Sequence, residues 1–251
     1  MARLFGAIKT KRLPIDYRMG IVSIMKESLK RSDSEYYKRM YEEKRLKMKP
    51  FTFSPFAKNF THLGEEIALE ELHVTFSSPD LEFLLHLYNG LQSIEEIMYR
   101  GYTLKKDRLR LLPEQTIQTP VVVFKTRSPI LVQDSEGRSI EPQDPRYSKE
   151  MNYLANLALH NYRGHGLQQP LFVQPLHMKK RVLKESNRDF REHHKGYLYF
   201  HTYQGTLAVQ GHPEDLQLLY QLGLGSRRGF GLGCVDVLQQ LHEMPGGAIG
   251  R

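Results

Sequence analysis

The chain has 251 residues, a length that suits one large domain or two small ones with a real core. Its composition is that of a globular protein, and no apolar run approaches the roughly 20 residues that a membrane-spanning helix needs. The single Cys234 excludes an intrachain disulfide, and the N-terminus is too short and too alternating for a signal peptide. These features predict a cytoplasmic protein with no membrane partner.

The first half of the chain alternates between strand-like and helix-like patterns. Strands are expected over 3–9, 51–56, 67–76 and within 98–112, and helices over 17–31, 34–44 and from Ser78 onward. Asp33 or Ser34 would cap the short second helix. Ser78 followed by Pro79 would begin the third helix, which Asn89-Gly90 would end.

The second half repeats this order. A strand is expected over 120–125, a helix over 147–162 that stops at Gly164, a long hairpin from 169–182 and 196–209, a helix over 213–222, and a last strand over 234–238. Each half therefore has the β-α-β-β-α-β order of the ferredoxin-like fold. The sequence predicts an α+β protein with two tandem ferredoxin-like domains, over 1–115 and 116–241, and a flexible tail over 242–251.

A glycine-rich stretch, Gly223-Leu-Gly-Ser-Arg-Arg-Gly-Phe-Gly-Leu-Gly233, links the last predicted helix to the last strand. Glycine lets a backbone approach a bulky partner closely, and neighbouring N–H groups with arginine side chains suit phosphate. The stretch precedes a strand rather than a helix and lacks Gly-Lys-Ser/Thr, so it is neither a Rossmann fingerprint nor a P-loop. It is either a phosphate-binding loop or a multi-glycine turn.

The net charge of +8 is concentrated in two stretches, 26–49 and 179–195, each with a net charge of +4. Concentrated positive charge is typical of a nucleic-acid footprint. The alternative is that both stretches are solvated faces.

Three segments resemble the CRISPR repeat-processing endoribonucleases of the RAMP superfamily. They are the glycine-rich stretch behind its Pro213 helix, Lys49-Pro-Phe-Thr-Phe-Ser54, and Ser128-Pro-Ile-Leu-Val132. The resemblance covers nearly the whole chain. It implies binding of CRISPR repeat RNA and its metal-independent cleavage, in which a 2′-hydroxyl attacks the adjacent phosphate and leaves a 2′,3′-cyclic phosphate and a 5′-hydroxyl.

Such chemistry needs a base, a cation for the phosphorane and an acid for the leaving oxygen. The family usually places a histidine after the first helix, but this sequence has none between Lys9 and Phe60. The resemblance puts Tyr41 at the histidine position, Lys26 near the usual tyrosine and Lys49 at the family's lysine, with Tyr37 and Tyr36 in reserve. Tyrosine and lysine are weak bases near neutrality, so a slow enzyme is expected, unless these tyrosines only pack or stack on RNA.

RNA-binding residues are expected in the glycine-rich stretch and in the two basic stretches: Gly225, Ser226, Arg227, Arg228, Gly229, Lys179, Lys180, Arg181, Arg39, Lys44 and Arg45. Phosphate contacts would give affinity, and unpaired bases would give sequence preference. His193 and His194 are more typical of RNA or solvent contacts than of catalysis. No metal-ligand spacing occurs, so neither a metal nor another cofactor is predicted.

Two other functions compete with repeat cleavage. A non-catalytic member could hold CRISPR RNA or present it within an effector complex, and the missing histidine keeps this alternative open. A homodimer is a separate expectation about the partners of the chain. A generic sheet-based RNA binder would carry a Lys/Arg-Gly-Phe-Gly-Phe type motif on a central strand, and the sequence contains none.

Overall fold

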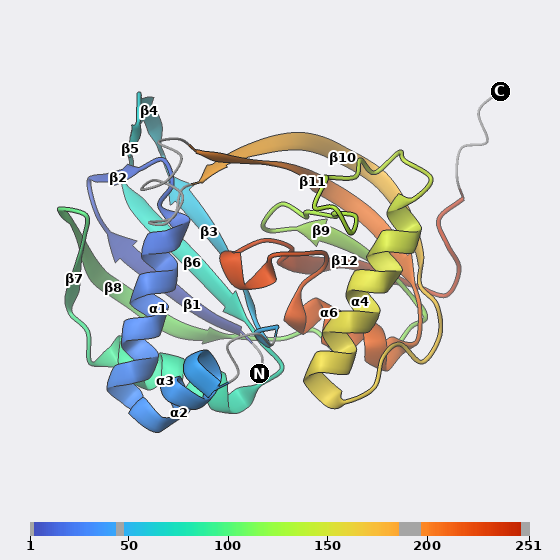
Figure 1. Cartoon of the computed structure of the whole chain (residues 1–251), viewed down its shortest axis with the longest axis horizontal. Helices are drawn as coiled ribbons and strands as arrows, with labels where there is room; N and C mark the ends of the chain where they lie inside the picture. Colours follow the sequence, from blue (N-terminus) through green and yellow to red (C-terminus); the bar gives the residue numbers. More distant parts are fainter. Residues whose placement is uncertain (1–2, 44–47, 186–196, 247–251) are drawn as a thin grey trace.

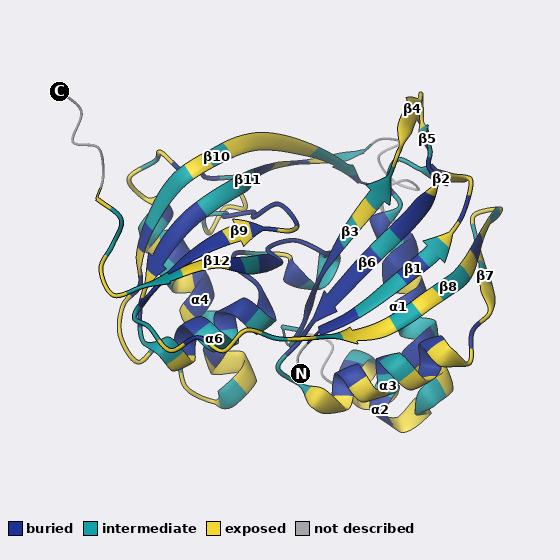
Figure 2. Cartoon of the chain, turned by 180° about the vertical axis from the view of Figure 1, so that it is seen from behind, coloured by how far each residue is buried: buried dark blue, intermediate teal, exposed yellow. Residues whose placement is uncertain are grey.

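The computed structural model describes residues 3–43, 48–185 and 197–246, in which two halves lie side by side (Figure 1). Each half consists of an antiparallel β-sheet and the helices that pack on it. Seen from behind, the sheet of the N-terminal half presents a face that no helix covers (Figure 2). No described helix is long and apolar enough to cross a membrane.

The N-terminal sheet has the strand order β3-β6-β1-β8-β7. These strands are β1 (Arg3–Lys9), β3 (Thr52–Lys58), β6 (Glu71–Ser77), β7 (Glu96–Tyr99) and β8 (Tyr102–Leu112). The helices of this half are α1 (Arg18–Ser32), α2 (Ser34–Lys38) and α3 (Leu81–Gln92), and α2 runs on into a π-helical turn, η1 (Arg39–Glu43). A small separate sheet contains β2 (Arg12–Pro14), β4 (Thr61–Leu63) and β5 (Glu66–Ala68).

The C-terminal sheet has the strand order β10-β11-β9-β12. These strands are β9 (Val121–Thr126), β10 (Phe172–Glu185), β11 (Leu198–Gln210) and β12 (Val235–Leu241). The helices are α4 (Tyr147–Arg163) and α6 (Pro213–Leu222), followed by a single 3₁₀ turn, η2 (Arg228–Phe230).

In both sheets the first core strand of the half lies between the third and the fourth, and the second strand lies at an edge. This is the ferredoxin-like arrangement, so the predicted fold is confirmed. Each half also has its own apolar core, with Leu4, Met25 and Phe83 in one and Phe124 and Leu207 in the other. The domain boundaries at 115/116 and 241/242 stay predictions, and residues 247–251 of the expected tail lie outside the described residues.

The start and the end of α3 differ from the prediction. Asp80 rather than Ser78 is the N-cap, because its carboxylate accepts a hydrogen bond from the Phe83 N–H at 3.1 Å, while the Ser78 hydroxyl accepts from the Asp80 N–H. The helix also continues through Asn89-Gly90 to Gln92. Gly90 is needed for close packing on α1, since a Cβ there would lie 1.8 Å from the Ser28 carbonyl oxygen.

Three other predicted elements are divided in the structure. The strand expected over 67–76 is two strands, β5 and β6, and the region from 98 to 112 belongs to the hairpin β7–β8. The helix expected over 34–44 is α-helical only as far as Lys38 before it widens into η1. The N-cap of this helix is Asp33, as one of the two predicted alternatives.

Buried polar contacts join the two halves. The Arg3 guanidinium of β1 donates to the Asp236 carboxylate at 2.5 Å and to the Val235 carbonyl oxygen, both in β12, and lies 4.2 Å from the centre of the Tyr220 ring. Arg3 is only 3% exposed, so these partners replace the water that its charge would otherwise need. The first and last strands of the fold are thereby bonded to each other.

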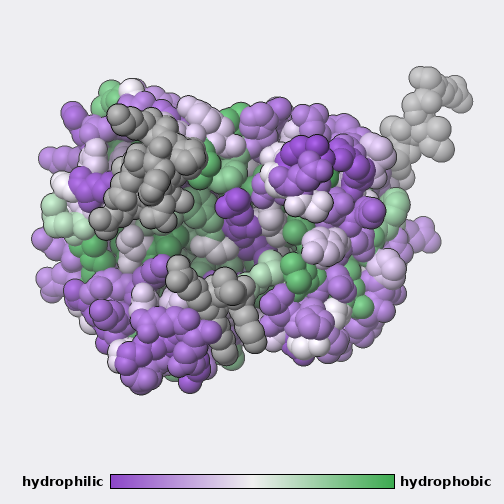
Figure 3. All heavy atoms as spheres, viewed as in Figure 1, coloured by the Kyte–Doolittle hydropathy of each residue, from purple (hydrophilic) through white to green (hydrophobic). Residues whose placement is uncertain are grey.

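The hairpin β10–β11 arches from the C-terminal half toward the small sheet of the N-terminal half (Figure 1). Near its far end the Lys184 ammonium lies 2.8 Å from the Glu65 carboxylate, which also accepts a hydrogen bond from the Tyr197 hydroxyl. Glu185, the last residue of β10, pairs with Arg18 of α1 at 3.3 Å. The arch therefore spans the depression between the halves, where the space-filling view shows a largely apolar floor (Figure 3).

Candidate functional site

The glycine-rich loop, residues 223–233, lies between the two halves. The backbone has a positive φ at Gly223, Gly225, Gly231 and Gly233, and also at Arg227. Side chains of the N-terminal half fix its end, because the Thr52 hydroxyl donates to the Leu232 carbonyl oxygen at 2.7 Å. The loop is thus a tightly folded connector that is anchored on both halves.

Ser226 uses its donors inside the protein. Its N–H and its hydroxyl both donate to the Leu131 carbonyl oxygen, at 2.8 and 3.0 Å. Ser226 stays a predicted RNA-binding residue, although in this structure both of these donors are directed into the protein. A Cβ at Gly225 would lie 2.5 Å from the same oxygen, so Gly225 is required for packing. Both residues shape the loop in this structure.

The two arginines of the loop differ in their surroundings. Arg227 is exposed, and its guanidinium lies 4.7 Å from the centre of the Phe200 ring. Arg228 is only 3% exposed, and its guanidinium donates to the Leu222 carbonyl oxygen at 3.2 Å. Its Nε has no partner among the described residues, and burial lowers the pKa of Arg228 to about 10. Arg227 is therefore the loop cation that is open to a ligand in the described conformation.

The four candidate catalytic residues lie together. The Lys26 ammonium of α1 is 4.8 Å from the centre of the Tyr41 ring in η1, and the Lys49 ammonium ahead of β3 is 5.1 Å from it. Tyr37 of α2 stacks on the same ring with centroids 5.3 Å apart. Cations placed near an aromatic ring are attracted by its quadrupole. We call these four residues the tyrosine–lysine cluster.

Burial changes what Tyr41 can do. Its hydroxyl is buried and has no hydrogen-bond partner among the described residues, and desolvation raises the pKa of Tyr41 further above its usual range. A phenol in this state keeps its proton at neutral pH and is a poor base. Lys49 is held in place by donating to the Met40 carbonyl oxygen. The cluster thus offers two ammonium groups around a neutral ring.

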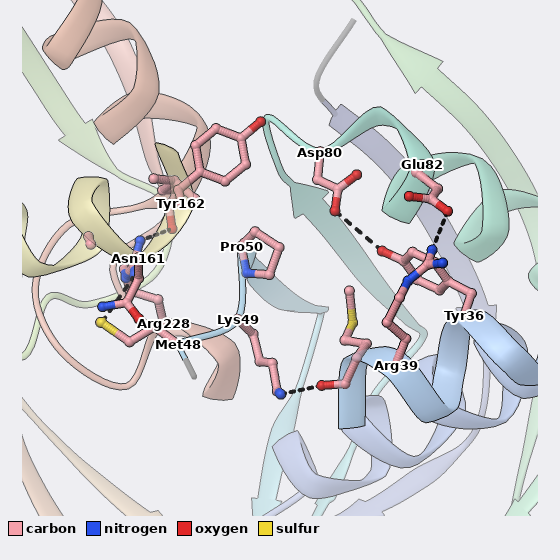
Figure 4. A pocket seen from close by; sticks show the side chains of 13 residues that line it. Tyr36, Arg39, Met48, Lys49, Pro50, Asp80, Glu82, Asn161, Tyr162 and Arg228 are labelled. Atoms are coloured by element: carbon pink, nitrogen blue, oxygen red, sulfur yellow. Dashed lines mark hydrogen bonds and ion pairs between the residues drawn. The ribbon is translucent and has the colours of Figure 1, made fainter. Parts of the chain in front are cut away.

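Two cavities meet at the loop and at Lys49, the member of the tyrosine–lysine cluster that lines them, and both are lined by Met48, Lys49 and Arg228. One has a volume of about 440 Å³, and its other lining residues are Met19, Glu185, Leu198, Phe200, Arg227, Gly229 and Phe230. The second, of about 220 Å³, opens toward the N-terminus of α3 and toward α4 (Figure 4). Gly229 is close to Lys49, with its position for a Cβ 3.7 Å from the lysine Cβ. The loop and Lys49 of the cluster therefore border one depression.

The remaining candidates lie around this depression or outside the described residues. Arg39 lines the smaller cavity, pairs with Glu82 at 2.5 Å and lies over the Tyr36 ring, and the Tyr36 hydroxyl donates to Asp80 (Figure 4). Three further candidates are exposed on β10 of the arch: Lys179, Lys180 and Arg181. The candidates Lys44, Arg45, His193 and His194 lie outside the described residues.

The cavity residues that were not predicted from the sequence include Glu185, Phe200 and Phe230. Desolvation raises the pKa of Glu185 to about 8 although Arg18 lies beside it, and one carboxylate oxygen has no partner among the described residues. Nothing in the local pattern marks this glutamate, because it ends an ordinary strand. Phe200 and Phe230 are ordinary apolar residues in the sequence, and only the packing of the loop near the β10–β11 arch brings them into one cavity. Among the described residues, no group of three His, Cys, Asp or Glu side chains could hold a metal ion.

Residues 112–237, half of the chain, match the family described as "CRISPR associated protein Cas6, C-terminal". The chain belongs to the Cas6 family. No curated protein sequence matches it. Similar solved structures share its fold across nearly its whole length.

Three of these structures indicate how far the likeness extends. "An RAMP protein binding different RNA substrates" has a TM-score of 0.77 at 15% identity and covers 95% of this chain and 100% of its own. A "Cas6-related gene from Pyrococcus furiosus" has a TM-score of 0.76 at 18% identity, covering 96% and 99%. "CRISPR associated protein Cas6" has a TM-score of 0.72 at 16% identity, covering 95% and 99%. At these identities the likeness shows the fold.

Proposed function

We propose that this Cas6-family protein is an endoribonuclease that binds CRISPR repeat RNA and cuts precursor CRISPR RNA in the depression between its halves. The proposal is supported most by the way that Lys26 and Lys49 converge on Tyr41 beside the glycine-rich loop. Family membership and the RNA binding named for a similar RAMP protein agree with it. The cut would proceed by attack of a 2′-hydroxyl on the adjacent phosphate, without a metal cofactor.

The two lysines would act on the phosphate. Attack by the 2′-oxygen places an extra negative charge on the phosphorane, and nearby ammonium groups stabilise that charge more than they stabilise the substrate. Lys49 also lines both cavities, so its ammonium lies next to the space in which RNA would be held. Arg227, exposed at the other wall of the larger cavity, would hold a flanking phosphate.

Tyr41 would position the lysines rather than transfer a proton. Its hydroxyl is buried and its raised pKa keeps it protonated, whereas the faces of its ring meet both ammonium groups. Tyr37, stacked on this ring, would keep it in place. Positioning of the RNA for in-line attack would supply a large part of the rate. The enzyme would be slow because Tyr41, with its raised pKa, does not act as a base near neutrality.

The test is incubation of the purified protein with the CRISPR repeat RNA of its own genome in EDTA, with both product ends mapped. A cut at one position that leaves a 2′,3′-cyclic phosphate and a 5′-hydroxyl is expected. Tyr41→Phe keeps the ring and should retain the rate within about threefold, whereas Tyr41→Leu should lose about tenfold or more. Tyr153→Phe, a change at an exposed tyrosine of α4, is the matched control.

A loss of a hundredfold or more in Tyr41→Phe would instead make the hydroxyl itself catalytic. Tight binding of repeat RNA with no cut over hours would favour the second candidate, a non-catalytic member that holds CRISPR RNA. The raised pKa of Tyr41 and the missing histidine are the observations that favour this candidate.

A further inference from the structure

Four flat side chains form a row across the uncovered face of the N-terminal sheet, one from each of four adjacent strands. The Phe56 ring of β3 lies 6.1 Å from the His73 ring of β6, and His73 lies 5.2 Å from the Phe5 ring of β1. The Arg110 guanidinium of β8 lies 4.8 Å from the centre of the Phe5 ring. The row follows the order β3-β6-β1-β8 in which the strands lie.

The register of the sheet produces this row. Phe56 is directly opposite His73, and Phe5 is directly opposite Arg110, so each pair shares one face. The neighbouring residues Leu4 and Val74 point the other way, into the core under the helices. The row therefore lies on the face that Figure 2 shows without helices over it.

The row is partly accessible, with Phe5 and His73 half-buried, and arginines border it. Phe56 is 61% exposed, an unusual exposure for a phenylalanine in a sheet. Arg108 and Arg110 are exposed on the same strand, and the Glu71 carboxylate accepts hydrogen bonds from both Arg108 and His73. At the edge next to the C-terminal half, Arg127 donates to the Thr75 hydroxyl.

A row of rings with arginines along it matches single-stranded nucleic acid in its chemistry. Unpaired bases stack on aromatic faces and on guanidinium planes, and the phosphates between them pair with arginine. A protein partner would instead be expected to need a broader apolar surface than a single row. The positive charge beside the rings, on a chain of net charge +8, favours the polyanion.

We propose that this sheet face is a second RNA-binding surface, on which unpaired bases stack on Phe56, His73 and Phe5 while Arg108 and Arg110 contact the adjacent phosphates. The proposal rests on the proposed function in taking RNA as the ligand. It concerns the face of the sheet opposite the helices, whereas the tyrosine–lysine cluster lies on the helical side. The physical basis of a sheet-based RNA binder is thus present without the sequence motif that such a binder would carry.

The test measures binding of a short single-stranded oligoadenylate that contains 2-aminopurine, whose fluorescence is quenched on stacking. Phe56→Ala and Arg110→Ala should each weaken binding about tenfold, and Phe56→Ala should also lose the quenching. Phe56→Tyr should bind as the wild type does, while Phe56→Leu should bind as weakly as Phe56→Ala. Tyr153→Ala removes a ring that is also 61% exposed, but on α4, and is the matched control.

Several results would overturn the proposal. Unchanged affinity in Phe56→Ala would do so, and so would full affinity in Phe56→Leu, because apolar contact rather than stacking would then suffice. A change of sedimentation in Phe56→Ala without a change in RNA affinity would assign the face to a contact between protein chains. The cleavage assay separates the two proposals: a protein that stacks oligoadenylate through Phe56 but leaves repeat RNA intact supports this surface and contradicts the endonuclease.

Discussion

The glycine-rich loop and Lys49 of the tyrosine–lysine cluster border the same depression, but the loop and the cluster differ in how their polar groups are arranged. In the loop, Ser226 donates to Leu131 and Arg228 to Leu222, so most of the polarity that its sequence displays is turned inward. In the cluster, two ammonium groups lie near the half-buried ring of Tyr41, whose hydroxyl is buried. A loop whose sequence is typical of phosphate binding can thus be a rigid structural connector, while the cations proposed to act in catalysis come from other segments.

The largest expected effect comes from a substitution that disrupts the glycine-rich loop. Gly233→Ala would place a Cβ 1.8 Å from the Leu224 carbonyl oxygen, at a φ of +73° that L side chains rarely adopt. We expect a loss of about 3 kcal/mol or more in the free energy of unfolding, measured by urea denaturation. Gly246→Ala, at a site where a Cβ meets nothing within 4 Å, should change stability by less than about 0.5 kcal/mol.

If Gly233→Ala had wild-type stability, the loop would tolerate a side chain at this position and would not be the rigid connector described above.

The next largest effect comes from substitutions that remove a positive charge from the tyrosine–lysine cluster and leave the glycine-rich loop unchanged. Lys26→Ala and Lys49→Ala should each slow repeat cleavage about a hundredfold, because one fewer cation faces the phosphorane. Single-turnover rates at saturating protein measure this, with RNA affinity determined separately. Lys149→Ala, a change at an exposed lysine of α4, is the control.

If the two lysine variants lost affinity in proportion to rate, the lysines would bind RNA without stabilising the transition state.

The smallest expected effect is on the pH dependence of stability, and it concerns the side chains of Arg18 and Glu185 that support the glycine-rich loop. Arg18 donates to the Gly231 carbonyl oxygen at 2.6 Å and pairs with Glu185, whose pKa burial raises from 4.5 to about 8. The folded state therefore binds the proton of the Glu185 carboxyl group more tightly than the unfolded chain does. The stability that this proton contributes is fully present below pH 4.5 and is lost as the pH rises through 8.

Glu185→Gln removes this titration. Between pH 6 and 9 the wild type should lose about 1–2 kcal/mol more stability than the variant, as followed by denaturation across that range. Glu136→Gln, at a highly exposed carboxylate, should follow the wild type. Parallel curves for the wild type and Glu185→Gln would show that Glu185 has the same charge in both states.

The sequence predicted most of the fold because its signals are local. The strand over Arg3–Lys9 and the helix over Pro213–Leu222 have the bounds that the pattern of apolar residues and the proline indicate. Gly90 was misread as a helix stop, because the need for glycine there comes from close packing against α1, which the local sequence does not reveal. Ser78 was misread as a cap because Asp80, two residues later, has the same capping chemistry.

The sequence predicted which residues of the tyrosine–lysine cluster lie together, but it did not predict their burial or their contacts. That Tyr41, Lys26 and Lys49 would be neighbours came from a resemblance between segments, and the structure brings them together. Which of Arg227 and Arg228 is buried depends on contacts with Leu222 and Met48 that no local pattern contains. The row of Phe5, His73 and Phe56 depends on strand register between distant segments.

The bond from Arg3 to Asp236 also bears on how the chain comes to be folded on the ribosome. The N-terminal sheet can assemble as soon as its five strands have emerged, yet the guanidinium of its first strand has its partners in β12. Until that last strand leaves the exit tunnel, the cation has to stay hydrated, because burying it without those partners is costly. The two halves can therefore lock together only after β12 has emerged, so the depression between them forms later than the N-terminal sheet.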